Sequence, residues 1–422
     1  MRYFLFIGFL LALQTVQAAF SDYFYDKTLR FDYFHTGNEN EDIISFDQMI
    51  EEPIWAGSKT QLTDTSGYGE YMFTIKDLNT KKLIYSRGFS SLFAEWQTTE
   101  EAKTTQKSFS ESVIFPFPKS KVILEIFCRK FSGSWELKFT YLINPADHFI
   151  SRERKMQYPC KVVQQSGEPS EKLDIVFISD GYTEGEMKKF SNDCKRFADY
   201  LLHCHPYDTY SNGINIWAVE APSTESGTDI PATGTWKNTV ANSTFYTFDS
   251  ERYLTTFDNK TLRNLAANAP YDQIVLLVNS EKYGGGGIFN QFAVTSVDNS
   301  LSAFVFTHEF GHAFAGLGDE YYTSDVAYTG FYNLEMEPWE PNLTTLVNFD
   351  AKWKNKVETG IPVPTPNEEK YKNVTGVFEG GGYITKGMYR PAYDCSMKSA
   401  VYNTFCPVCR DAIGRMIDFY SK

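Results

Sequence analysis

The chain has 422 residues, of which 42% are hydrophobic and 22% are charged, a mixture typical of a globular protein long enough for two domains. Its formal net charge of −13 would repel phosphate backbones, so nucleic acid is excluded as an expected partner. Aromatic residues make up 16% of the chain, a content that favours β-rich packing but identifies no ligand.

Residues 1–18 are typical of a secretory signal peptide. Arg2 supplies a positive start, an almost unbroken apolar run extends from Tyr3 to Leu13, and Val16-Gln17-Ala18 is a small-residue cleavage pattern. Because the apolar run is shorter than the ~20 residues of a bilayer-spanning helix, we expect cleavage near Ala18 and a secreted protein, extracellular or periplasmic. No later stretch of the sequence is long and apolar enough to span a bilayer, so we expect no stable membrane insertion.

Residues 19–147 are predicted to form a β-rich accessory domain. Short runs of aromatic and β-branched residues recur between turn signals rich in Gly, Asn, Asp and Ser, without long helical periodicity. These runs lie at residues 71–75, 83–85, 122–127 and 137–142. Their spacing favours a β-sandwich, and the polar residues 148–172 that follow are predicted to be a linker.

A different pattern begins at Leu173 and continues to the end of the chain. Apolar runs typical of buried strands lie at residues 173–178, 214–219 and 274–278. Between the first two, Thr183 and Glu186 have the spacing of a capping box that opens a helix. Strands that alternate with helices indicate a mixed, twisted sheet covered by helices. We therefore expect residues 173–422 to form an α/β domain and the whole chain to be an α+β protein.

Four consecutive glycines, Gly284 to Gly287, precede a predicted strand at residues 288–294. Such a strand can form the edge on which an extended peptide pairs. The glycines themselves have two interpretations. They either let a substrate backbone approach closely or form only a flexible loop.

The clearest chemical motif lies in a predicted helix over Ser302–Leu317, for which Asp298, Asn299 and Ser300 are candidate caps. The helix contains His308-Glu309-Phe310-Gly311-His312. Two histidines four residues apart project from one helical face and can reach a single ion. Glu309 is then placed to act on a zinc-bound water without ligating the metal. The motif predicts that His308 and His312 bind Zn²⁺ and that Glu309 is catalytic. The alternative is a buried helix with two hydrogen-bonded histidines.

A catalytic zinc needs a third protein ligand and an open position for water. Gly316 and Gly318 can end the helix and turn the chain back, so that Asp319 meets the same ion. We predict Asp319 as the third ligand. The alternatives are the neighbouring Glu320 and, from a later helix, one of two further glutamates, Glu335 or Glu337.

The interval from Gly316 to Asp319 resembles the metzincin zinc motif, with one extra residue after His312. That resemblance implies a methionine-containing turn beneath the metal, and Cys395-Ser396-Met397 fits this position. Just before it, Tyr389 and Arg390 are equally consistent with a contact to the substrate or oxyanion and with a structural role.

Seven cysteines follow the apolar run, so at least one is left over if the others pair. Cys406 and Cys409 form a CxxC motif, which suggests a redox or zinc-binding knuckle, but no second CxxC completes a four-thiolate site. We therefore expect a structural disulfide that involves Cys395, Cys406 or Cys409. For His203 and His205, which flank Cys204, we expect a surface or core role rather than a second metal site.

Several segments resemble the IgA peptidase family of zinc metallopeptidases over nearly the whole chain that follows residue 18. They are Tyr25–Arg30, Asp174–Tyr182, His308–Tyr321 and Cys395–Cys409. The resemblance implies an endopeptidase whose β-rich N-terminal part matches the family's accessory domain. It does not establish that immunoglobulin A is the substrate.

The expected function is that of a secreted zinc endopeptidase, with a protein or peptide as substrate. Immunoglobulin and other host or extracellular proteins are candidate substrates. One alternative is an exported binding or adhesion protein with a non-catalytic peptidase scaffold. Another is a zinc hydrolase acting on a non-peptide amide. Glu309 and both histidines of the motif are intact, which favours the enzyme over the scaffold.

Overall fold

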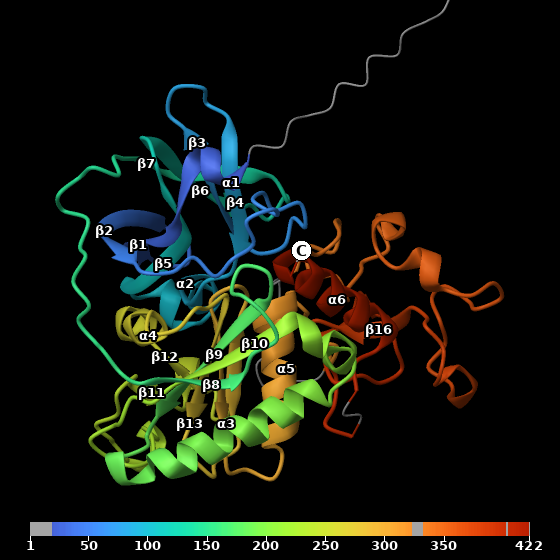
Figure 1. Cartoon of the computed structure of the whole chain (residues 1–422). Helices are drawn as coiled ribbons and strands as arrows, with labels where there is room; N and C mark the ends of the chain where they lie inside the picture. The colour runs from blue at the N-terminus through green and yellow to red at the C-terminus, as the bar shows by residue number, and fades with distance from the viewer. Residues whose placement is uncertain (1–18, 323–331, 402–403, 422) are drawn as a thin grey trace, which may run out of the picture.

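The computed structural model describes residues 19–322, 332–401 and 404–421. The predicted signal peptide, residues 1–18, lies outside the described residues. Sheets dominate the described part and a few helices cover them, so the predicted α+β class is confirmed (Figure 1). Within those three ranges, no helix combines the length and apolar character needed to cross a membrane.

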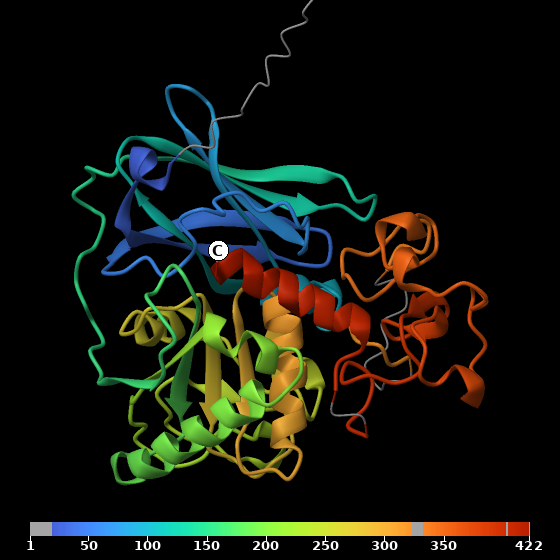
Figure 2. The same ribbon diagram turned by 45° about the vertical axis from the view of Figure 1, so that its right-hand side comes forward.

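Two antiparallel sheets build the N-terminal part (Figure 2), with strand orders β2-β1-β5 and β4-β3-β6-β7. Their strands are β1 (Phe24–Gly37), β2 (Asp42–Glu52), β3 (Tyr71–Asp77), β4 (Leu83–Phe89), β5 (Lys107–Pro118), β6 (Val122–Arg129) and β7 (Trp135–Ile143), preceded by helix α1 (Phe20–Tyr23). The four predicted strand runs fall within β3, β4, β6 and β7. Side chains such as Phe31, Phe73 and Leu124 belong to one buried cluster shared by both sheets, which therefore pack on a common core.

A six-stranded sheet of order β14-β15-β13-β9-β10-β8 builds the second part. Its strands are β8 (Cys160–Gln164), β9 (Leu173–Asp180), β10 (Ile214–Val219), β13 (Gln273–Val278), β14 (Gly285–Ile288) and β15 (Phe292–Ser296). The four inner strands pair in parallel, whereas β8 and β14 are antiparallel edge strands. Every residue of β9, β10 and β13 is buried, which explains why their sequences are mostly apolar.

Helices cover both faces of this sheet. The helices are α2 (Leu92–Gln97), α3 (Met187–Leu202), α4 (Asn259–Ala266), α5 (Ser302–Ala315) and α6 (Pro407–Ser421). One face shares a core with α3, α5 and α6, and the other packs against α4 and against α2, which comes from the N-terminal part. The N-terminal part is therefore packed directly onto the second sheet (Figure 2).

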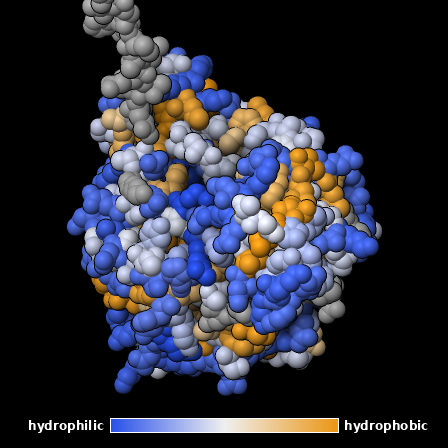
Figure 3. Space-filling model, turned by 90° about the vertical axis from the view of Figure 1, so that its right-hand side faces the viewer, coloured by the Kyte–Doolittle hydropathy of each residue, from blue (hydrophilic) through white to orange (hydrophobic). Residues whose placement is uncertain are grey.

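Short elements complete the described chain. The remaining strands are β11 (Ser243–Thr244), β12 (Thr255–Thr256), β16 (Phe378–Gly381) and β17 (Ile384–Arg390). The 3₁₀ helices are η1 (Glu101–Lys103), η2 (Glu184–Glu186), η3 (Tyr207–Gly213), η4 (Pro231–Thr233), η5 (Thr247–Asp249), η6 (Phe349–Ala351), η7 (Lys354–Lys356) and η8 (Glu369–Tyr371). On the face drawn in Figure 3, hydrophobic side chains gather in separate patches among hydrophilic ones.

Three local predictions need correction. Cys160–Gln164, inside the range assigned to a linker, is the edge strand β8, whose residues are all exposed or half-buried. The strand predicted at residues 288–294 is interrupted by a turn: Ile288 ends β14, Asn290 with a left-handed φ of 55° reverses the chain, and residues 292–294 belong to β15. The glycines before it are not a loop, since they form most of β14.

Helix α5 begins at Ser302, as predicted, and ends at Ala315, two residues before the predicted end at Leu317, but the predicted caps do not cap it. Leu301 is the N-cap of α5 and makes no side-chain cap bond; of the candidate caps, Asn299 bonds to the Leu301 N–H, one residue before the helix. At the other end, Gly316 has a left-handed φ of 61° and terminates the helix as expected. The predicted capping box of Thr183 and Glu186 is also confirmed, and it opens η2 ahead of α3.

Candidate active site

Two imidazole rings on α5 are held by backbone carbonyl groups. The Nδ1 of His308 lies 2.8 Å from the Ser396 carbonyl oxygen, and the Nδ1 of His312 lies 2.5 Å from the Leu317 carbonyl oxygen. A carbonyl oxygen only accepts hydrogen bonds, so each Nδ1 carries the proton and donates it. The Nε2 atoms of the neutral rings are then free to bind a cation, and they lie 3.1 Å apart.

Asp319 meets both rings at the same point. Its Oδ1 lies 3.1 Å from Nε2 of His308 and 3.3 Å from Nε2 of His312, so three ligand atoms form a nearly equilateral triangle. Nitrogen and oxygen ligands of a tetrahedral zinc stand about 3.3 Å apart, given bond lengths of about 2.0–2.1 Å. The buried Oδ1 has no hydrogen-bond partner, whereas Oδ2 accepts a hydrogen bond from the Tyr383 hydroxyl. The residues present therefore fit a metal ion with one open position.

The other carboxylates considered as third ligands point elsewhere. The side chain of Glu320 is fully buried and bonds to Asn342 and Cys409 instead of meeting the two histidines. Glu337 accepts hydrogen bonds from the Thr344 hydroxyl and the Asn348 backbone, and Glu335 is exposed. Of the candidate ligands, the structure brings together His308, His312 and Asp319.

The electrostatics of this cluster favour a bound cation. Burial lowers the pKa of His312, but Asp319 and Glu309 outweigh it and raise that pKa to about 9. Despite burial, the two histidines hold the pKa of Asp319 well below its ordinary value. Burial raises the pKa of Glu309, which suits a side chain that must take up a proton and release it again.

The triangle opens into a cleft of about 510 Å³. Glu309 of α5 and the glycines of β14 line it, together with Tyr253 and with Glu95 of α2. A larger cavity, of about 840 Å³, lies elsewhere and contains none of the three ligand residues or Glu309. The smaller cleft is therefore the one that gives access to the candidate metal position.

Glu95 is a cleft residue that the sequence reasoning missed. It accepts a hydrogen bond from the Tyr253 hydroxyl, and burial raises its pKa to about 7. It lies more than 200 residues before the histidine motif, in a part of the chain expected to be an accessory domain. Because no local pattern marked it, only the packing of α2 against the second part places it in the cleft. Tyr253 and Tyr383 also carry no local sequence pattern, and only the tertiary fold places them in the cleft.

The segment Cys395–Met397, predicted to form a methionine-containing turn, packs against helix α5. Met397 is fully buried, and a Cβ built on Gly311, between the two histidines, would lie 3.0 Å from its Sδ. The Met397 carbonyl accepts a hydrogen bond from the Glu320 N–H at 2.7 Å. This segment therefore contacts the helix at Gly311, holds His308 through the Ser396 carbonyl and holds the chain that carries Asp319.

The remaining candidates have structural or surface positions. Arg390 is fully buried and donates hydrogen bonds to the backbone carbonyls of Glu379 and Gly380, which favours its structural interpretation. Tyr389 pairs with Thr344 through the backbone. His203 and His205 are exposed, and the Nδ1 of His205 lies 2.8 Å from the Asp208 carboxylate, in agreement with the expected surface role.

The edge strand β14 lies so close to α5 that a side chain on Gly287 has no space. A Cβ there would lie 2.2 Å from the Glu309 carbonyl oxygen and 3.1 Å from the His312 Cβ. We expect Gly287→Ala to destabilise the fold by about 1–3 kcal/mol, as overpacking does, and to lower activity by shifting Glu309. Chemical denaturation measures the first effect. Gly185→Ala is the matched control, because a Cβ on Gly185 meets nothing within 4 Å. Equal stability of the two variants would contradict the close approach.

Comparison with known protein families gives two matches that together span most of the chain. Residues 162–374 and 367–417 match the family described as IgA Peptidase M64. Residues 19–140 match the family described as Peptidase M64 N-terminus. No curated protein matches the chain.

Proposed function

The chain belongs to the IgA peptidase M64 family, and from this premise we propose that it is a secreted, zinc-dependent endopeptidase. Membership makes it a hydrolase of protein or peptide substrates within a metallopeptidase family. The single observation that carries the finer proposal is the triangle of His308, His312 and Asp319 ligand atoms, 3.1–3.3 Å apart, at the base of a cleft. Its unpartnered buried carboxylate oxygen supports a cation as the missing partner.

We assign the metal to these three residues and the proton transfers to Glu309. A bound zinc ion supplies Lewis acidity, which polarises the scissile carbonyl group and acidifies a water molecule. Glu309 takes the proton from the attacking water and delivers it to the leaving amine. The Ser396 and Leu317 carbonyls keep both imidazoles oriented, and the Tyr383 hydroxyl does the same for Asp319. Neither a serine nor a cysteine nucleophile is needed in this mechanism.

The substrate is proposed to bind as an extended strand along β14. The segment at Leu254 already bonds to the Gly285 carbonyl oxygen at 3.1 Å, so it occupies the start of that edge. Gly286 and Gly287 line the cleft beyond this point, and their backbone, which lies beside Glu309, is proposed to pair with the substrate strand. An internal segment of a polypeptide fits this arrangement, because an edge strand and an open cleft accept chain on both sides of the scissile bond.

Removal of the metal tests the proposal directly. We expect a zinc chelator to abolish hydrolysis of a quenched-fluorescent peptide library, and added Zn²⁺ to restore it. Intact immunoglobulin A is assayed in parallel, because the family name makes it the first protein substrate to try. Hydrolysis that persists after chelation and dialysis would contradict metal-dependent catalysis. Bound metal without cleavage of any peptide would favour the non-catalytic scaffold instead.

A further inference from the structure

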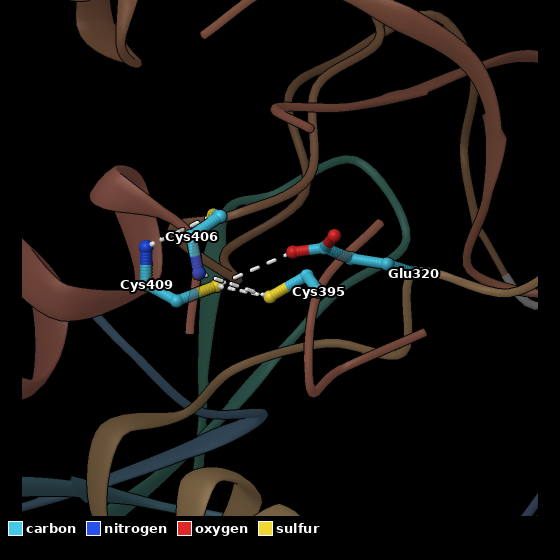
Figure 4. Close-up of side chains that lie close together, drawn as sticks. All are labelled: Glu320, Cys395, Cys406 and Cys409. Atoms are coloured by element: carbon cyan, nitrogen blue, oxygen red, sulfur yellow. Dashed lines mark hydrogen bonds between the residues drawn. The ribbon is translucent and has the colours of Figure 1, made fainter. Parts of the chain in front are cut away.

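A second cluster of metal-binding side chains lies directly behind the candidate active site. It consists of Glu320, Cys395, Cys406 and Cys409, and one ligand atom of each lies within 4.8 Å of the others (Figure 4). All four side chains are buried, and none of them is needed for the peptidase mechanism. Cys406 directly precedes α6 and Cys409 lies in its first turn, whereas Glu320 and Cys395 come from two separate loops that approach them (Figure 4).

One oxygen of the carboxylate in this cluster lacks a hydrogen-bond partner. Oε1 of Glu320 accepts hydrogen bonds from the Asn342 amide at 3.0 Å and from the Cys409 thiol at 3.2 Å. Oε2 is buried and has no hydrogen-bond partner, although the side chain is fully enclosed. An unpaired carboxylate oxygen in the interior carries a large desolvation cost, which a bound cation would offset.

Two of the sulfur atoms accept hydrogen bonds from backbone N–H groups, and two have the spacing of ligands to one metal ion. The Cys406 N–H donates to Sγ of Cys395 at 3.2 Å, and the Cys409 N–H donates to Sγ of Cys406 at 3.5 Å. Backbone N–H groups directed at sulfur stabilise thiolates. The Sγ atoms of Cys395 and Cys409 lie 3.9 Å apart, close to the roughly 3.8 Å edge of a tetrahedron with zinc–sulfur bonds of about 2.3 Å.

We propose that Cys395, Cys406, Cys409 and Glu320 bind a second metal ion, with zinc as the favoured element. Each of the three thiols releases its proton to solvent and binds as a thiolate, and the ionised carboxylate supplies the fourth ligand. Three sulfurs and one oxygen in tetrahedral spacing are typical of zinc. Because protein atoms fill all four positions, the ion has a structural role.

This site would fix the geometry of the active site. Glu320 directly follows Asp319, and Cys395 directly precedes Ser396, whose carbonyl oxygen orients His308. One ion would therefore connect the loop that carries Asp319 with the loop whose Ser396 carbonyl orients His308. The inference goes beyond the proposed function and does not depend on it, since a non-catalytic scaffold could hold the same ion.

All seven cysteines are free thiols in the structure, so the predicted disulfide that involves Cys395, Cys406 or Cys409 is not formed there. A disulfide would join two of these sulfurs and leave the third thiol outside the bond. The metal site uses all four groups. The two states differ in metal content and in the number of thiols, which makes them separable by experiment.

The test counts metal ions in the full-length secreted chain by inductively coupled plasma mass spectrometry. We expect two equivalents of zinc in the wild type and one in His308→Ala/His312→Ala. After exchange into Co²⁺, the double variant should keep the sulfur-to-cobalt charge-transfer absorption in the near ultraviolet. That absorption reports thiolate ligands and is independent of peptidase activity. Loss of all metal from the double variant would overturn the proposal.

The cysteine variants supply the reverse experiment. Cys409→Ser should lose one equivalent of metal and the charge-transfer absorption, whereas Cys160→Ser, which alters an exposed cysteine outside the cluster, should keep both. If Cys409→Ser fails to fold, alkylation of the wild-type protein provides a second test. Its three cluster thiols should become open to alkylation only after denaturation with a chelator. A cross-linked peptide that joins two of the three cysteines would overturn the proposal.

Discussion

Replacement of Glu309 by glutamine should lower peptide hydrolysis by about 10²–10⁴-fold, the usual contribution of a general acid–base group. The amide has nearly the shape of the carboxylate but cannot accept a proton from water. Glu309 is half-buried in the cleft, one residue after His308 and on the same helix as both histidines. We expect the loss to appear in kcat with the quenched-fluorescent peptides, because the side chain is proposed to act on the reacting water.

Measurement of the metal content shows whether Glu309→Gln has lost only a proton acceptor or the metal site as well. Glu309→Gln should keep the zinc content of the wild type, since His308, His312 and Asp319 are unchanged. Glu335→Gln is the matched control, because it makes the same chemical change at an exposed glutamate that belongs neither to the metal-ligand cluster nor to the cleft lining, and it should keep full activity. A Glu309→Gln enzyme with more than a tenth of wild-type activity would show that another group takes the proton.

Local periodicity accounts for what could be predicted of the site. Two histidines four residues apart on a helix must share a face, and a left-handed glycine at Gly316 turns the chain so that Asp319 returns to them. These relations span 12 residues of chain and depend on helix geometry alone. The buried strands β9, β10 and β13 were predictable for a similar reason, because full burial leaves a mostly apolar sequence.

Features that depend on contacts between distant segments could not be predicted. Glu95 enters the cleft only because α2 packs on the second sheet, and β8 is a strand only because β10 offers an edge to it. The CxxC motif gave no hint of Glu320, which lies 86 residues earlier and reaches Cys409 through tertiary folding. A search for a second CxxC could not find a cluster whose other members are one cysteine and one carboxylate.

Replacement of Asp319 by alanine should weaken zinc binding by more than about 100-fold and abolish hydrolysis with it. Loss of a group that merely orients a ligand costs 10–100-fold in affinity, so loss of the ligand itself should exceed that range. Removal of the carboxylate also leaves two imidazoles, which are too few to hold a catalytic zinc. Competition with a chelator of known affinity measures the change.

Two further variants decide whether Asp319 is a ligand or only a partner of the histidines. Tyr383→Phe removes the hydrogen bond to Oδ2 and leaves Oδ1 in place, so its metal affinity should fall by the smaller factor of about 10–100-fold. Glu337→Gln changes a carboxylate that bonds to Thr344 and Asn348, and it should leave metal content unchanged. If Asp319→Ala kept wild-type metal content while Glu337→Gln lost one equivalent, the third ligand would lie on the later segment. The graded order of Asp319, Tyr383 and Glu337 follows from their contacts: Asp319 supplies an atom to the triangle, Tyr383 bonds to Asp319, and Glu337 bonds to Thr344 and Asn348 instead.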